Sequence, residues 1–394
     1  MTASSGRRGR ARARALAAAA AAIASSAALA ACASPSSSSA AGNPAAASAP
    51  AVSLATSLST ATDTWAIVPM TANPTFWEVF VRPANSATWQ LVTPPGVADN
   101  GGLVAAAGPG RSLTVAVRPS QDLEFSPLAS TADAGGSWSA GAPLSAGVAA
   151  SPGALAVSGR ELAALLGNGT IEASSDAGSS WRTLAKPGAI AASAAGKKCG
   201  TVGVTAVSFG LAPGAVLAAG TCGATGTTGF FDYSASGGWQ RSSLPVSGQL
   251  VRLGEDTALV RAKAGLTALW LGGWYAYAPL ATAAPQPSTS LTPSAPLPIT
   301  SGVVASGGLT GSPGGLWALM PGGQAATIAG PGQQWLLLPP TPAHTSVLAS
   351  GPGNALDALA VSGSTLTVWQ LDRGATLWTK AQTMTVPIQY GSSG

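Results

Sequence analysis

A tryptophan followed by a short strand-like run, and usually then by a Pro or Gly turn, recurs seven times and constrains the fold more than any other feature. The tryptophans lie about 48 residues apart on average, and runs rich in Val, Leu and Thr precede several of them. Repeats of about 40 to 50 residues, each with three to four short strands, are typical of β-propeller blades. The seven residues are Trp89, Trp138, Trp181, Trp239, Trp274, Trp335 and Trp378.

The composition agrees with an all-β chain that has many turns. The 394 residues include 50 glycines and 30 prolines, and helix formers other than alanine are scarce. Because a blade cannot bury both faces of its sheet alone, neighbouring blades must stack and the ring must close. We therefore predict one seven-bladed β-propeller over 63–394, with a Pro-rich loop insertion at 282–302. We expect closure by pairing of terminal strands, with Asp63–Met70 and Ala381–Tyr390 as candidates.

The first 31 residues have the features of an export signal. Five arginines precede an apolar run of about sixteen residues, which is short for a spanning helix because a bilayer needs about 20. The run ends in "LAAC", Leu29–Cys32, which resembles the bacterial lipobox. This resemblance implies a diacylglycerol on the Cys32 sulfur and a lipid anchor on the extracytoplasmic face of the cell membrane. The alternative is an ordinary cleavage site with a cysteine nearby, and Arg7 and Arg8 leave open general or twin-arginine export.

The segment 32–62 consists mainly of Ala, Ser, Pro and Thr, with almost no charged or aromatic residues. Such a composition buries too little apolar surface to fold, so we predict a disordered tether between anchor and propeller. The five arginines of the signal also account for the excess of 19 basic over 14 acidic residues. The mature chain is therefore near neutral, and we predict no nucleic-acid partner.

Two further cysteines, Cys199 and Cys222, remain in the mature chain. An oxidising extracytoplasmic compartment favours a disulfide between them, with two free buried thiols as the alternative. The chain has a single histidine, His344, far away in sequence, so we predict neither a metal site nor a cofactor.

Two eight-residue segments, "TADAGGSW" (131–138) and "SSDAGSSW" (174–181), fit the pattern Ser/Thr-x-Asp-x-Gly-x-x-Trp. A short Asp side chain can accept backbone N–H groups of its own turn, and glycine supplies the positive φ that a tight turn needs. The pattern resembles the Asp-box, or BNR repeat, of sialidase-like propellers, which implies a structural turn between the third and fourth strands of a blade. A third copy, Asp232–Trp239, has Ser236 in place of the acid. The residues concerned are Thr131, Asp133, Gly135, Trp138, Ser174, Asp176, Gly178 and Trp181.

The same resemblance raises the alternative of a sialidase-like glycoside hydrolase acting on surface glycans. Members of that family use a tyrosine nucleophile with a glutamate, an acid/base aspartate and three arginines. We interpret Arg82 and Arg118 as surface residues late in their strands. Of the four tyrosines, Tyr275 and Tyr277 lie in the apolar run "GGWYAYAPL", and Tyr233 and Tyr390 have no obvious glutamate partner. We therefore predict no catalytic residue.

The remaining class is a non-enzymatic module, with a monomeric propeller that binds a protein or a glycan at the cell surface. Long insertions on a rigid scaffold often carry function. The candidate binding loops are therefore 282–302 and the segment with Lys197, Lys198 and Cys199. The alternative is that both are solvated, poorly ordered segments with no role in binding.

Overall fold

The computed structural model describes most of the chain after residue 53, all of it within one compact unit, Pro50–Gly394. Within the described residues, no helix is long and apolar enough to cross a membrane. The described ranges are 54–60, 62–70, 76–95, 102–117, 128–209, 215–223, 226–234, 238–241, 246–254, 257–271, 291–293, 296–297, 305–308, 315–330 and 333–387.

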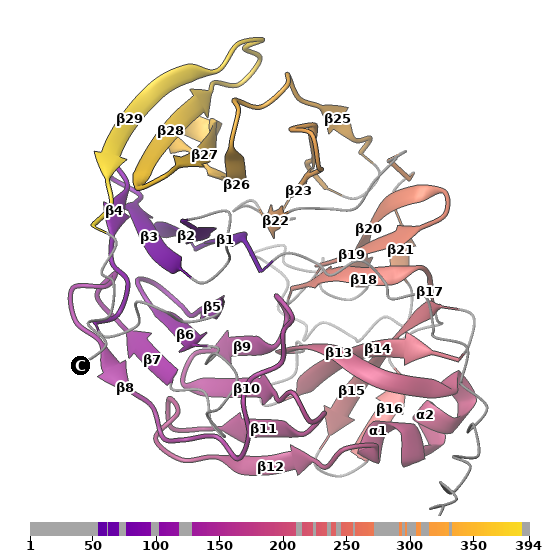
Figure 1. Cartoon of the computed structure of the whole chain (residues 1–394). Helices are drawn as coiled ribbons and strands as arrows, with labels where there is room; N and C mark the ends of the chain where they lie inside the picture. Colours follow the sequence, from indigo (N-terminus) through magenta and orange to yellow (C-terminus); the bar gives the residue numbers. More distant parts are fainter. Residues whose placement is uncertain are drawn as a thin grey trace, which may run out of the picture. The chain divides into compact units, whose positions relative to one another are not determined.

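Seven four-stranded antiparallel units make up the structure, which confirms the predicted all-β, seven-bladed propeller (Figure 1). Each unit uses four strands that are consecutive in sequence. The strands of the first four blades are β1 (Thr56–Ser59), β2 (Asp63–Pro69), β3 (Trp77–Pro83), β4 (Gln90–Leu91), β5 (Leu103–Ala107), β6 (Leu113–Val117), β7 (Leu128–Thr131), β8 (Ser139–Ala140), β9 (Leu155–Ser158), β10 (Glu161–Leu165), β11 (Ile171–Ser174), β12 (Arg182–Ala185), β13 (Thr201–Phe209), β14 (Val216–Cys222), β15 (Thr227–Ser234) and β16 (Gly238–Arg241).

The last three blades follow the same plan. Their strands are β18 (Gln249–Leu253), β19 (Thr257–Ala262), β20 (Gly265–Leu271), β21 (Leu291–Pro293), β22 (Ala305–Gly308), β23 (Leu316–Leu319), β24 (Ala325–Ile328), β25 (Leu336–Leu337), β26 (Thr345–Ser350), β27 (Leu356–Ser362), β28 (Thr365–Leu371) and β29 (Thr379–Thr385). Outside this plan lie β17 (Val246–Ser247), which pairs with β15, and the short helices α1 (Ala189–Ala192), α2 (Ala194–Cys199) and η1 (Pro352–Asn354).

The core lies between the blades. The middle strands are nearly continuous Val, Leu, Ala and Ile runs, and β2 and β6 are buried along almost their whole length. A sheet stacked between two others has both faces covered, which explains apolar runs without polar alternation. The first strand of each blade contacts the first strand of the next, and β26 of the last blade contacts β1 of the first. The ring is therefore closed.

Closure does not follow the predicted pairing of Asp63–Met70 with Ala381–Tyr390. Strand β2 pairs with β1 and β3, and β29 pairs with β28. Because every blade is built from its own consecutive strands, no blade needs a strand from the other end of the chain. Instead, β1 pairs in parallel with β22 of the sixth blade, and the Ser57 hydroxyl donates to the Leu348 carbonyl of the seventh (2.7 Å).

Two of the predicted boundaries need correction. Strand β1 lies inside the segment 32–62 that we predicted as a tether, so the propeller begins before residue 63. Strand β21 lies inside the predicted insertion 282–302 and forms the outer strand of the fifth blade. The predicted signal peptide, Cys32 and the rest of the predicted tether up to residue 53 lie outside the described residues.

The repeated tryptophans mark one position in the blade. Five of them directly precede a fourth strand, and Trp239 is the second residue of β16. Trp274 lies outside the described residues. At the entry to the outermost strand the indole packs against the hydrophobic core, with Trp89 buried and the other described tryptophans of the series partly buried. The five are Trp89, Trp138, Trp181, Trp335 and Trp378.

Candidate functional site

The first strands of the first five blades surround a cavity of about 650 Å³ along the axis of the ring. Its lining includes the turns that follow β5 and β9, so one end of the cavity lies where the first strands end. We call this end the channel mouth, defined by Ser59, Thr60, 108–110, Ser158 and Gly159.

The cavity wall consists mainly of apolar side chains, glycine and several hydroxyl groups. Among the described lining residues, Arg252 of β18 is the only one with an ionisable side chain, and its Nη1 donates to the Thr56 hydroxyl (3.3 Å). General acid–base chemistry needs a positioned group that can give or take a proton near neutral pH. The side chains in the described part of the wall instead offer apolar contacts and hydrogen-bonding groups.

Contacts between the first two blades brace the channel mouth. The Thr60 hydroxyl donates to the Gly110 carbonyl (2.9 Å). Next to it, Arg111 Nε lies 3.7 Å from the buried Asp63 carboxylate while about half of the arginine side chain stays exposed. The rim of the mouth is therefore a set of turns held by hydrogen bonds.

The segments 131–138 and 174–181, which we call the Asp turns, join the third and fourth strands of the second and third blades. In the first, Asp133 Oδ1 accepts from the Ser137 N–H (2.9 Å) and Oδ2 from the Ser137 hydroxyl (2.8 Å). The Thr131 hydroxyl donates to Asp133 (2.7 Å) and accepts from the Gly135 N–H (2.9 Å). Both polar side chains of the motif are therefore used inside the turn.

The second Asp turn repeats this pattern. Asp176 accepts from the Ser180 N–H (2.9 Å) and the Ser180 hydroxyl (2.6 Å), and Ser174 donates to it (2.7 Å). Hydrogen bonds from the side chains of Ser180 and Ser174 and from the Ser180 backbone lower the pKa of Asp176 to about 2. Those from the Ser137 backbone, and from the side chains of Thr131 and Ser137, lower the pKa of Asp133 to about 2. Both carboxylates are ionised at neutral pH and bonded within their own turns.

The backbone of the Asp turns explains their sequence. Gly135 and Gly178 have φ of 84° and 83°, in the region where glycine is favoured. The alanines before them, Ala134 and Ala177, also have positive φ, at 60° and 61°. A Cβ at Gly135 would lie 2.4 Å from Val92 Cβ of the first blade, so this position also needs glycine for a close approach.

Each Asp turn contacts the turn between the first and second strands of its own blade. The Ala134 N–H donates to the Arg111 carbonyl (3.0 Å), and the Ala177 N–H donates to the Arg160 carbonyl (2.8 Å). Gly110 and Gly159, the neighbours of these arginines, line the cavity. The Asp turns are therefore hydrogen-bonded to the turns that form the channel mouth, but they contribute no side chain to it.

A buried polar cluster joins the first and last blades. Arg82 Nε lies 3.4 Å from Asp357 Oδ2, and the two side chains are 4% and 3% exposed. Arg82 Nη2 donates to the Ser350 carbonyl (2.7 Å), and Trp89 Nε1 donates to Asp357 Oδ2 (2.9 Å). Gln382 completes the cluster, since it accepts from the Trp89 N–H (2.7 Å) and donates to the Trp89 carbonyl (2.9 Å).

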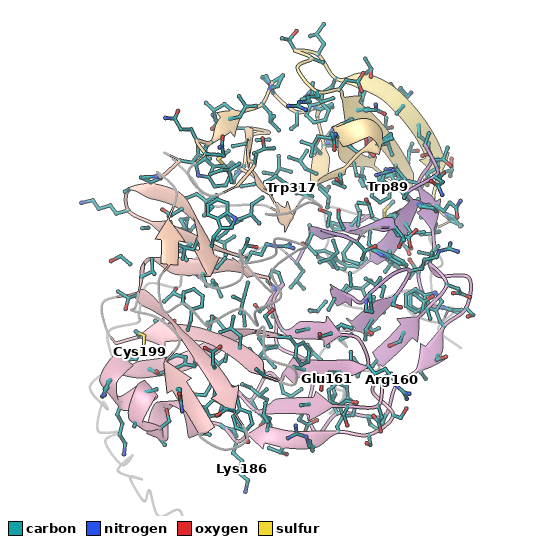
Figure 2. The ribbon with its side chains drawn as sticks, turned by 180° about the vertical axis from the view of Figure 1, so that it is seen from behind. Trp89, Arg160, Glu161, Lys186, Cys199 and Trp317 are labelled. Carbon is teal, nitrogen blue, oxygen red and sulfur yellow. A yellow bond between two sulfur atoms is a disulfide. The ribbon has the colours of Figure 1, made fainter. Side chains whose placement is uncertain are left out.

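Burial dominates the electrostatics of this cluster. It raises the pKa of Asp357 to about 6, although the hydrogen bond from Trp89 and the charge of Arg82 act in the opposite direction. Burial also lowers the pKa of Arg82. Figure 2 shows Trp89 at the boundary between the first and the last blade. Our interpretation of Arg82 as a surface residue is therefore wrong, because the side chain points into the joint that closes the ring.

The disulfide predicted between Cys199 and Cys222 is confirmed, with a Cα–Cα distance of 5.0 Å. It links the end of α2 to the end of β14, and Figure 2 shows the sulfur of Cys199. A Cβ at Gly229 would lie 2.4 Å from the Cys222 sulfur, so the neighbouring strand leaves room for the bridge only with glycine there. Lys197 and Lys198 are exposed on α2.

The other residues that we considered from the sequence do not come together in a site within the described part. Tyr233 packs against Trp239 with ring centroids 5.2 Å apart, and His344 is exposed in a turn with φ of 64°. The described residues contain no group of three His, Cys, Asp or Glu that could hold a metal ion. Five residues lie outside the described ranges, namely Arg118, Ser236, Tyr275, Tyr277 and Tyr390.

Sequence reasoning missed the channel mouth and the Arg82–Asp357 pair. The mouth is built from serine, threonine, glycine and proline, which carry no local signature in a chain that is full of them. Asp357 did carry a signal, since it is a lone acid in the apolar run "ALDALAV". A buried acid needs a partner, and that reasoning could have led to a search for one.

Comparisons with known proteins agree with the fold. No protein-family model and no curated protein matches the sequence. The structure is similar to that of a Lactobacillus plantarum protein, with 10% identity, a TM-score of 0.52, and 83% of this chain and 97% of that one covered. A proposed 6-phosphogluconolactonase of Bacteroides uniformis gives 14% identity, a TM-score of 0.51 and the same coverage.

A GH74 xyloglucanase of Xanthomonas campestris is also similar, with 16% identity and a TM-score of 0.49. The match covers 80% of this chain and 51% of the xyloglucanase, so the chain spans about half the length of that enzyme. At identities this low, the likeness shows the propeller fold alone.

Proposed function

We propose that the protein is an extracytoplasmic lipoprotein, anchored through Cys32, whose propeller binds a protein or glycan at the channel mouth without catalysing a reaction. The cavity of about 650 Å³ at the centre of the ring carries this proposal. Preformed concave sites of this volume on rigid scaffolds are typical ligand sites.

The chemistry of the wall supports binding rather than turnover. Ser158 places an exposed hydroxyl group at the mouth, while small side chains such as Ala106 leave room behind it. Hydroxyl and backbone groups make neutral hydrogen bonds, which suit the amide groups of a polypeptide or the hydroxyl groups of a sugar chain.

Ser158 provides a direct test of the binding site. It is exposed at the end of β9 and lines the cavity, so Ser158→Trp fills the mouth without disturbing a packed side chain. Ser362, exposed at the end of β27 in the last blade and outside the cavity lining, provides the matched control Ser362→Trp. The chain from Ala33 onward is immobilised and exposed to envelope proteins and to cell-wall glycans.

A ligand of the channel mouth binds the unmodified chain and the Ser362→Trp variant, and is lost with Ser158→Trp. Equal capture by all three chains would refute binding at the mouth. The anchor is tested separately by intact-mass measurement of the membrane fraction. Acyl chains are expected on Cys32, and a free thiol at that position would refute the lipoprotein assignment.

A further inference from the structure

The large hydrophobic side chains that are exposed among the described residues all lie on the sixth and seventh blades. Leu336 and Leu337 of β25 are 64% and 53% exposed, and Leu377 before β29 is 76% exposed. Single exposed leucines are ordinary on a protein surface, but three on adjoining blades indicate an interaction site. We call these three leucines, with Trp378, the apolar flank.

A contact between the two blades joins the chain segments that carry the apolar flank. Trp378 Nε1 donates to the carbonyl of Pro339 (3.4 Å), which lies two residues after Leu337. The half-buried Trp378 thus connects Leu377 on one blade with the outer strand of the other.

The sequence around the apolar flank is depleted in charge. Between Lys263 and Asp357 the chain contains no Asp, Glu, Lys or Arg, so the strands of the sixth blade carry none of these side chains. Removing a charge from water is costly, and a surface without charges can enter an apolar medium without that penalty. On the seventh blade, Arg373 and Lys380 are exposed on either side of Leu377, and Asp372 accepts a hydrogen bond from Gln370 (2.6 Å).

We propose that the apolar flank rests on the surface of the lipid bilayer, with the leucines in the boundary between headgroups and acyl chains. Leu and Trp flanked by Lys and Arg are the residue types that favour this boundary, where long cationic side chains can reach the headgroups.

The length of chain before the propeller also favours the lipid bilayer as the partner of the apolar flank. About twenty residues separate Cys32 from Leu54, and a chain of that length can span at most about 75 Å. The inference rests on the proposed lipid anchor, because a tether this short keeps the propeller beside the membrane. The anchor then adds to a contact that the apolar flank makes by itself, because it raises the effective concentration of the surface.

The alternative mode of membrane contact is through the cationic side of the third and fourth blades, where Lys186, Lys197 and Lys198 are exposed. Attraction there depends on anionic lipid and is screened by salt, whereas burial of leucine depends on neither. Vesicles of phosphatidylcholine alone, at low and high salt, therefore separate the two modes. Vesicles with equal parts of phosphatidylcholine and phosphatidylglycerol serve as the anionic comparison.

The chain from Ala33 onward, without the acylated cysteine, is expected to float with phosphatidylcholine vesicles at both salt concentrations. Leu336→Ser/Leu337→Ser/Leu377→Ser should lower the partition coefficient at least tenfold. Lys197→Gln/Lys198→Gln should leave it unchanged. Leu377→Ser alone, at the most exposed of the three positions, should lower it less and keep the thermal unfolding of the parent.

Absence of flotation with phosphatidylcholine, or loss of binding only in the lysine variant, would overturn the inference. A parent chain that is dimeric by light scattering, and becomes monomeric in the leucine variant without binding vesicles, would assign the apolar flank to self-association instead. Because this assay contains no lipidated cysteine, it can fail while acylation of Cys32 is found, and the reverse also holds.

Discussion

Arg82 and Asp357 form a buried ion pair between the first and the last blade, with 3.4 Å between Nε and Oδ2. The backbone between these two blades is not joined by exchange of a strand, so side-chain contacts carry much of the closure. Removing one partner of a buried pair leaves a charge without compensation. The joint between the first and last blades is therefore sensitive to mutation of either partner.

Arg82→Met should lower the free energy of unfolding at pH 7 by about 3 kcal/mol, because Asp357 loses its counterion inside the protein. The double variant Arg82→Met/Asp357→Asn should recover part of this loss, since the buried group is then neutral. Urea unfolding of the two variants measures the difference. Equal destabilisation by both would show that packing of the arginine stem, and not charge, matters at this position.

Asp357 should also make stability depend on pH. Its pKa is raised from 3.8 to about 6, so the folded state binds a proton more tightly than the unfolded state does. The contribution of this group is complete below pH 3.8 and is lost as the pH rises through about 6, by about 3 kcal/mol in total. The difference in unfolding free energy between the parent and Asp357→Asn, measured from pH 4 to pH 7, should follow this curve. A constant difference would contradict the raised pKa.

The Asp turns should respond to acid in the opposite direction. Asp133 has a pKa lowered from 3.8 to about 2, so its stabilising contribution is present above pH 3.8 and disappears as the pH falls through 2. Asp133→Ala should melt at a lower temperature than the parent at pH 7, and the gap should close near pH 2. Asp372→Ala, in the third-to-fourth-strand turn of the last blade, is the control. A gap that persists at pH 2 would exclude the carboxylate hydrogen bonds as its cause.

Ala177→Gly should stabilise the protein by about 0.5 kcal/mol. The exposed alanine has φ of 61°, a backbone conformation that costs residues other than glycine about 1 kcal/mol or more. Relief of this strain should exceed the destabilisation that glycine causes by increasing the conformational entropy of the unfolded chain. Gly178→Ala should have the opposite effect, because φ is 83° there and the new Cβ would meet Leu162 Cδ1 at 3.0 Å. Thermal unfolding of the two variants compares these effects directly.

Loss of the disulfide should destabilise the fourth blade. Cys199→Ala/Cys222→Ala opens a loop of 23 residues, and the chain-entropy model gives about 3 kcal/mol for a loop of that size. Denaturant unfolding of the variant, and of the parent with and without reductant, measures this loss. Reduction of the parent should reproduce the variant, and a much smaller loss on reduction would show that the bridge is not the source of the stability.

The features that sequence predicted well are local ones. Trp138 and Trp181 directly precede the fourth strands of their blades, and a tryptophan at that position recurs often enough to count seven blades. The spacing of Ser or Thr, Asp and Gly follows from hydrogen bonds and positive φ within one turn, so a short local pattern was enough to predict the turn.

The features that sequence did not predict depend on residues far apart in the chain. Strand β1 has the polar sequence "TSLS", and it is buried only because β22 and β26 lie against it. Nothing local distinguishes it from the Ser- and Ala-rich segment before it. Likewise, Arg82 reaches Asp357 only when the first blade meets the last, and the channel mouth exists only where the first three blades meet.

The joint between the first and last blades also bears on assembly. As the chain emerges during synthesis, six blades can form their sheets while Arg82 and Trp89 still lack the side chains that will cover them. Asp357 and Gln382 arrive with the final blade. A polypeptide that stops before this blade exposes a cation and an indole at an open edge, a surface that a quality-control protease or chaperone can recognise.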